Sequence, residues 1–139
     1  MSQTRTSSDA MQQAKAQLES IVELAVAMET AQTDGEAFFE GETLSLDELE
    51  DRAREWPLSV LVRSEWTSPG SELTAAEYEI LLCTGGPAVR LRGDLASYGE
   101  AETAFLEYQG WFTAWDRLAL SSDESDAVAR FVSLFWFGD

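Results

Sequence analysis

The chain has 139 residues, 45% of them hydrophobic and 11% aromatic, which is enough for one globular domain with its own core. Its 26 acidic and 9 basic residues give a formal net charge of −17, and a field of that sign repels nucleic acid and anionic membranes. There is no histidine and a single cysteine, Cys83. That composition excludes Ser-His-Asp and Cys-His catalysis, an intramolecular disulfide and a typical structural zinc site.

The N-terminal part of the sequence predicts one long helix. Residues 1–8 are polar and without periodicity, so we expect a frayed start followed by a single domain over residues 9–139. The helix is expected from Asp9, because apolar residues then recur every three or four positions. This stripe suits packing on the protein's own sheet, and it also suits pairing with a partner or a second copy. Its members are Met11, Ala14, Leu18, Ile21, Ala25 and Met28.

Two glycines and a proline divide the next segment. Gly35 is expected to end the first helix, and Gly41 marks a second break. Ser45 and Glu48 match a capping box, in which each side chain bonds a free amide at the start of a helix. A short helix is therefore expected after Ser45, and Pro57 ends it, because proline disfavours the helical conformation of the residue before it.

The segment after Pro57 alternates apolar and polar residues, which predicts a half-buried strand. Ser59 and Arg63 would face the solvent in this strand. Trp56, just before it, fits a core position as well. The residues expected to face the core are Leu58, Val60, Val62 and Trp66.

A hairpin is the best-specified element of the sequence. Alternating side chains flank the turn residues Thr84–Pro87, and a four-residue loop places Glu79 opposite Arg92, an attractive cross-strand pair. An odd-length loop would turn one apolar set outward. The apolar side chains that would face the core are Tyr78, Ile80, Leu82, Val89 and Leu91.

The C-terminal part predicts one more strand and one more helix. The strand is expected near Thr103–Gln109, and the helix after Ser121, where Ser121 and Glu124 repeat the capping box. Strands in succession, without βαβ alternation, predict an α+β fold. We expect an antiparallel sheet of about four strands, packed against a long N-terminal helix, a short helix and a C-terminal helix. The buried stripe of the last helix would be Val128, Phe131, Val132 and Phe135.

The stretch from Glu19 to Asp51 holds eleven acidic residues and no basic one. A solubilising surface usually mixes both signs. Attraction to a cationic groove on a partner would explain the bias, and so would drift on a tolerant surface. Trp111 and Trp115 lie in an aromatic segment whose rings would either anchor an interface or pack in the core. The candidate partner-binding residues are Glu19, Glu23, Glu36, Glu40, Glu42, Asp47, Glu48, Glu50, Asp51, Trp111 and Trp115.

No catalytic residue, cofactor site or metal site is expected. The segment Thr84–Pro87 lacks the Gly-Lys-Ser/Thr of a phosphate-binding loop, and Cys83 has no His or Lys near it in sequence that would activate the thiol. The first ten residues lack the apolar core of a secretory signal, and no run of 18 apolar residues occurs. We therefore expect a cytoplasmic protein that contacts neither membrane nor nucleic acid directly.

Three segments of the C-terminal half carry a family resemblance. They are Thr84–Arg90 (TGGPAVR), Gln109–Trp115 (QGWFTAW) and Phe135–Gly138 (FWFG), and they resemble a group of small proteins from phages and other mobile elements. The resemblance covers residues 75–139 and implies no catalytic residue. It implies a setting in which small acidic proteins often inhibit host defence, as anti-restriction and anti-CRISPR proteins do by occupying nucleic-acid grooves.

These observations predict a non-catalytic acidic protein that acts as a DNA mimic. It would occupy a basic, nucleic-acid-handling surface of a partner such as a host defence complex. The alternative is a structural or adaptor protein whose N-terminal helix binds another chain, or pairs with itself in a homodimer, through Met11, Leu18, Ile21 and Ala25.

Overall fold

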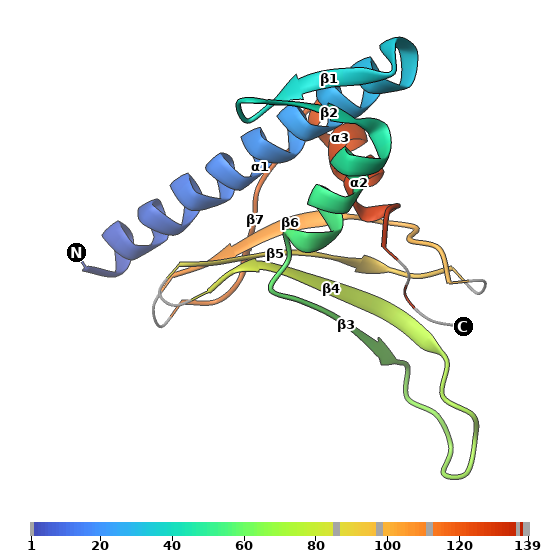
Figure 1. Cartoon of the computed structure of the whole chain (residues 1–139). Helices are drawn as coiled ribbons and strands as arrows, with labels where there is room; N and C mark the ends of the chain where they lie inside the picture. The colour runs from blue at the N-terminus through green and yellow to red at the C-terminus, as the bar shows by residue number, and fades with distance from the viewer. Residues whose placement is uncertain (1, 85–86, 97–98, 111–112, 136, 138–139) are drawn as a thin grey trace.

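The computed structural model describes residues 2–84, 87–96, 99–110, 113–135 and 137. Within these residues, three helices and seven strands form an α+β fold, as predicted. In chain order the elements are α1 (Ser2–Asp34), β1 (Glu36–Phe39), β2 (Glu42–Ser45), α2 (Leu46–Glu55), β3 (Ser59–Ser64), β4 (Ala75–Cys83), β5 (Ala88–Asp94), β6 (Phe105–Gln109), β7 (Asp116–Arg117) and α3 (Ser122–Val132). All three helices lie on one side of the larger sheet (Figure 1).

The first helix is longer than the sequence predicts. α1 begins at Ser2, so the expected frayed segment 1–8 is helical from its second residue, and the predicted start at Asp9 is wrong. Gly35 ends the helix as expected, with a φ of +90° and an N–H bond to the carbonyl of Ala31 at 2.8 Å.

The buried stripe of α1 is also wider than predicted. α1 packs on β1, β5, β6, α2 and α3, and so many neighbours need a broader apolar face than a heptad seam provides. Met11 is exposed and Ala25 is half-buried, whereas Leu24 lies in the core. The buried residues of α1 are Ala10, Ala14, Leu18, Ile21, Leu24, Ala27, Met28 and Ala31.

A two-stranded sheet that the sequence analysis missed follows α1. β1 and β2 pair antiparallel with Phe39 opposite Glu42, and Glu40 and Gly41 form the turn. Both turn residues have positive φ, +50° and +81°, which is the geometry of a type I′ hairpin. Ala37 and Phe39 are buried against α1. Four-residue strands carry too little alternation to be recognised from sequence.

Both predicted capping boxes are present. The Ser45 hydroxyl accepts from the N–H of Glu48 at 3.2 Å, and the Glu48 carboxylate accepts from the N–H of Ser45 at 2.9 Å. Ser121 and Glu124 make the same exchange at 3.2 and 2.8 Å. α2 and α3 begin directly after these N-caps. Their buried faces include Leu49, Ala53, Val128, Phe131 and Val132.

Trp56 contacts both other helices from the end of α2, in agreement with its predicted core position. Its Nε1 donates to the side-chain oxygen of Gln17 on α1 at 3.0 Å. Its ring packs edge-on against Phe131 of α3, with the ring centroids 5.4 Å apart. Trp56 itself is the C-cap residue of α2, so one half-buried side chain connects all three helices.

The larger sheet has the strand order β3-β4-β5-β6-β7, with antiparallel pairing throughout. The predicted hairpin is confirmed, because Glu79 lies opposite Arg92 and the strands flank residues 84–87. Gly85 and Gly86 of that loop lie outside the described residues. β6 corresponds to the strand expected near 103–109. All five apolar residues predicted to face the core are buried: Tyr78, Ile80, Leu82, Val89 and Leu91.

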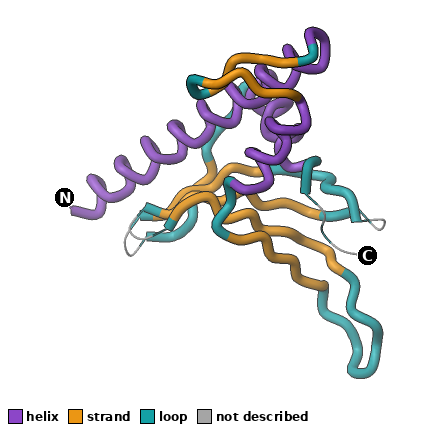
Figure 2. Tube along the Cα trace, in the orientation of Figure 1, coloured by secondary structure: helices purple, strands orange, loops and turns teal. Residues whose placement is uncertain are grey.

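The strand predicted after Pro57 exists, but the prediction that it is half-buried is wrong. β3 is an edge strand, and α1 packs on β5 and β6 rather than reaching over it. Figure 2 shows the helices gathered away from β3 and the loop after it. The residues predicted to face the core are therefore exposed, namely Leu58, Val60, Val62 and Trp66.

Candidate interaction surfaces

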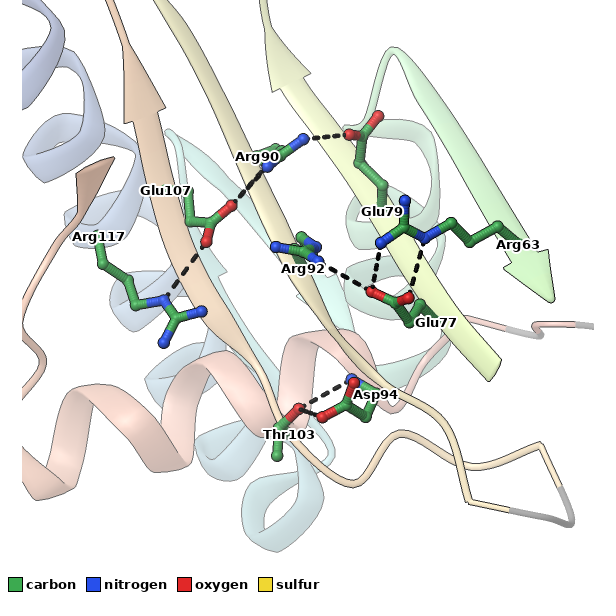
Figure 3. Close-up of polar contacts among 9 residues, drawn as sticks. All are labelled: Arg63, Glu77, Glu79, Arg90, Arg92, Asp94, Thr103, Glu107 and Arg117. Carbon is green, nitrogen blue, oxygen red and sulfur yellow. Dashed lines mark hydrogen bonds and ion pairs between the residues drawn. The ribbon is translucent and has the colours of Figure 1, made fainter. Parts of the chain in front are cut away.

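The face of the sheet turned away from the helices, here called the outer face, carries a lattice of alternating charges (Figure 3). Glu77 on β4 accepts two bonds from Arg63 on β3, at 2.9 and 3.0 Å, and one from Arg92 on β5 at 2.9 Å. Arg90 on β5 bonds Glu79 at 2.7 Å. Between β4 and β5 the side-chain pairs thus run diagonally, although Glu79 and Arg92 are direct backbone neighbours, whereas Arg63 and Glu77 lie directly opposite each other.

The lattice continues to the other edge of the sheet. Glu107 on β6 is 5% exposed and accepts from Arg90 at 2.9 Å and from Arg117 on β7 at 3.4 Å. The guanidinium of Arg90 stacks on the ring of Trp115 at 3.9 Å, and that of Arg117 on Phe105 at 3.7 Å. Every charge is compensated by a neighbour, so the lattice holds strands together and leaves no reactive group unpaired.

Trp115, predicted as an aromatic anchor or a core residue, lies apart from the acidic residues of α1. It is half-buried on the outer face, where it covers Arg90, whereas α1 lies on the opposite side of the sheet. Trp115 therefore cannot act in the same contact surface as Glu19 and Glu23. Trp111, the other predicted aromatic anchor, lies outside the described residues.

The predicted acidic residues fall into two groups, and four members of the first lie beside basic side chains. Arg52 pairs with Glu42 and lies 3.9 Å from Glu40, and these contacts raise the pKa of the guanidinium. Arg54 lies 3.4 Å from Asp51 and 3.9 Å from Glu50, which is half-buried. These basic residues follow directly on the acidic stretch in sequence. Counting the acidic residues from Glu19 to Asp51 alone therefore overstates the net negative charge of the surface that a partner would contact.

Glu48 and Asp47 in this group stabilise α2. Two hydrogen bonds with Ser45, the larger contribution coming from its backbone N–H, lower the pKa of Glu48. Asp47 lies in the first turn, where the helix dipole favours a negative charge. Glu36 is exposed at the start of β1. The helix thus accounts for part of the acidic bias that the sequence attributed to partner binding.

The second group lies on the side of α1 that faces away from the sheet. Glu19, Glu23 and Glu29 are exposed, and none has a described basic side chain within 4.0 Å of its carboxylate. They flank Val22 and Val26, which are four residues apart on one helix face.

Two neighbouring elements complete this surface. A groove of about 610 Å³ between α1 and α3 adds Asp123 and Asp126 beside Val26, and Arg130 lines the same groove, where it bonds Gln32. A second groove, of about 390 Å³, adds Phe38 of β1 on the other side of Val26. Val26 is 57% exposed and Phe38 is 74% exposed. We call this set the acidic surface: Glu19, Val22, Glu23, Val26, Glu29, Phe38, Asp123 and Asp126.

The sequence analysis found Glu19 and Glu23 but missed the rest of the acidic surface. The valines at 22 and 26 share a helix face with Glu19 and Glu23, and this spacing is a signal that could have been read. Phe38, Asp123 and Asp126 come from elements that only the tertiary fold brings to α1.

The predicted partner-binding stripe of α1 is not available as a surface. Leu18 and Ile21 are buried in the core, where they pack under the sheet and the other helices. Pairing with another chain through these residues would require the core to open. The stripe therefore supports packing within the chain, which was the other interpretation of its periodicity.

The described residues include one thiol, that of Cys83. Burial raises the pKa of the half-buried Cys83 thiol, so the reactive thiolate is disfavoured. Among the residues with defined placement, no group of three His, Cys, Asp or Glu side chains is arranged to hold a metal ion. None of the described helices combines the length and apolar character needed to cross a bilayer.

Comparison with protein-family models, with curated proteins and with solved structures finds no match to this chain. The resemblance to small proteins of phages and mobile elements therefore stays a prediction.

Proposed function

We propose that the protein is a non-catalytic, acidic binding protein that occupies a basic, nucleic-acid-handling surface of a partner protein. A host defence complex, inhibited in the anti-CRISPR or anti-restriction manner, is the partner class that the sequence resemblance favours. The observation that carries the proposal is the acidic surface, four of whose carboxylates line the two grooves that contain the exposed side chains of Val26 and Phe38.

The chemistry of this surface matches what such a partner offers. Proteins that bind single-stranded nucleic acid combine a positively charged groove for the phosphates with exposed aromatic side chains for the bases. Carboxylates on the acidic surface would take the place of phosphates, and Val26 and Phe38 the place of bases. A surface that served solubility alone would not need exposed apolar groups among its charges.

The experiment begins with capture of the partner. The tagged chain is incubated with a lysate of its natural host, and the retained protein is identified by mass spectrometry and then purified. A single-stranded oligonucleotide should displace the partner from the chain. Association should slow as salt rises, because the ions screen the attraction between opposite charges.

Two variants with equal charge changes locate the contact. Replacing Glu19, Glu23, Glu29 and Asp126 by Gln or Asn should slow association by about tenfold at low salt. The matched control replaces Glu42, Asp47, Glu48 and Asp51 in the same way and should have a smaller effect, because these carboxylates interact with Arg52, Arg54 or the start of α2. Gln at 48 preserves the capping box.

The apolar part of the contact is tested separately. Phe38→Ala should increase the dissociation rate by about tenfold while changing association little, since short-range packing acts after encounter. Equal effects of the two charge variants would show that net charge matters and the acidic surface does not. Binding that neither salt nor the oligonucleotide alters would contradict the proposal.

A further inference from the structure

A second surface, remote from the acidic one, carries most of the exposed apolar side chains. Six of the nine large hydrophobic residues that are exposed in the described chain lie between residues 58 and 73. Leu61 is 57% exposed, and Trp66 is fully exposed. We call this set the β3 strip: Leu58, Val60, Leu61, Val62, Trp66 and Leu73.

β3 also offers an open strand edge. Among the described strands it is the first of the sheet and pairs on one side only, with β4. Natural proteins protect such edges by shortening them, by placing charges on them or by covering them. The opposite edge strand, β7, has just two residues, both charged. β3 has six residues, with Val60, Leu61 and Val62 in succession, and its one charge, Arg63, and the irregularity beside it lie at the C-terminal end of the strand.

We infer that residues 60–68, the C-terminal part of β3 and the four residues after it, pair with the same segment of a second copy of this chain, in antiparallel fashion about a twofold axis. The charge distribution favours a second copy over a basic partner. Residues 58–73 carry one basic and two acidic residues, in a chain whose net charge is −17. A basic partner would be drawn to the acidic surface, whereas two copies repel each other least at this nearly neutral strip.

The strip is complementary to itself, as a twofold interface requires. A register centred on Ser64, the last residue of β3, places Arg63 of one copy opposite Glu65 of the second copy and Val62 opposite the second copy's Trp66. Residues 65–68 therefore extend β3 in the dimer. The twofold axis repeats both pairs. Arg63 is well exposed and retains Glu77 of its own chain in this arrangement. Each opposite-charge pair across strands contributes roughly 0.2–1 kcal/mol.

The apolar area suits a dimer of ordinary size. A tryptophan alone buries about 150–250 Å², and Trp66 is fully exposed beside Val60, Leu61 and Val62. A standard interface buries about 800 Å² on each partner, somewhat more than half of it apolar. The β3 strip therefore supplies the apolar part of such an interface without any rearrangement of the core.

Sedimentation of the full chain over a range of concentrations tests the inference. The wild type should show a species of twice the monomer mass of 15.4 kDa. Val62→Lys should raise the dissociation constant of the dimer at least tenfold, because a lysine on an edge strand opposes pairing. The matched control, Val26→Lys, introduces the same charge at another exposed valine and should leave the dimer intact.

A charge exchange tests the register. Glu65→Arg and Arg63→Glu should each weaken self-association, and an equimolar mixture of the two variants should restore it, because both cross-strand pairs are then of opposite charge. Trp66→Ala, at a fully exposed position, should weaken the dimer without affecting the fold, and circular dichroism checks the fold of every variant.

Three results would overturn the inference. The first is that the wild type stays monomeric at all concentrations. A monomeric wild type that binds an extended peptide of another protein would count as the same result. The second is a dimer that Val62→Lys and Trp66→Ala leave unchanged. The third is a dimer that Val26→Lys dissociates, which would move the interface to the acidic surface.

Discussion

β3 and β4 are paired residue by residue, yet they meet opposite environments. Val60 and Ile80 lie directly opposite each other on the same side of the sheet. Ile80 is fully buried, whereas Val60 is 38% exposed. The difference arises because β4 has a strand on both sides and lies nearer the helical layer, while β3 has one neighbouring strand. Alternation in a sequence thus determines which side chains share a face, and other segments determine whether that face is covered.

The prediction with the largest expected effect shortens each of the two facing residues, Ile80 and Val60, to alanine. Ile80→Ala should lower the free energy of unfolding by about 3 kcal/mol, because it removes buried methyl groups and leaves a cavity. Val60→Ala should lower it by less than about 1 kcal/mol, since part of this side chain already contacts water. Chemical denaturation at low protein concentration measures both. Similar losses at the two sites would show that β3 is covered in solution.

A second test compares two arginines of the outer face. Arg90→Ala removes one of the two partners of the buried Glu107 and should destabilise the fold by about 3 kcal/mol. Arg63→Ala should have a much smaller effect, because Arg63 is exposed and Glu77 keeps Arg92. Thermal unfolding reports the difference as separate shifts in Tm. Equal shifts would contradict the view that the lattice is stronger at its centre.

The elements with local signals were predictable. Ser45 with Glu48 and Ser121 with Glu124 set the starts of α2 and α3, because a capping box is completed within four residues. The β4–β5 hairpin was predictable in register from Glu77 to Leu81, because its loop length and its alternating residues agree there. Beside the loop an irregularity shifts the register and pairs Cys83 with Val89.

The features that the sequence analysis predicted wrongly or missed depend on contacts between distant segments. The outward position of Trp66 follows from how far the helical layer extends, and no local pattern encodes that distance. The diagonal ion pairs arise because Arg90 reaches both Glu79 and the buried Glu107, which comes from a strand that the hairpin alone does not contain. The acidic surface was half predicted, because α1 supplies a part that is local in sequence while β1 and α3 supply the rest.

The smallest expected effect concerns pH and again separates the edge strand from the centre of the sheet. Hydrogen bonds from Arg63, and then from Arg92, hold the pKa of Glu77 below its ordinary value of 4.5. The unfolded chain therefore binds a proton at this residue more readily than the folded chain does. The stability that Glu77 contributes is fully present above the ordinary value and is lost as the pH falls through the folded value.

The measurement is the difference in free energy of unfolding between the wild type and Glu77→Gln, which cancels most of the titration of the other carboxylates. This difference should favour the wild type at neutral pH and shrink steadily below pH 4.5. Repeating the pair in an Arg63→Ala background leaves Arg92 as the remaining partner, so the pH dependence should diminish without vanishing. The amount that persists is the contribution of the central strand, and the amount lost is that of β3. Protonation should remove the advantage that the charged carboxylate gives the wild type. A difference in free energy of unfolding that does not change with pH, or that grows as the pH falls, would therefore mean that these two arginines do not bind Glu77 in solution.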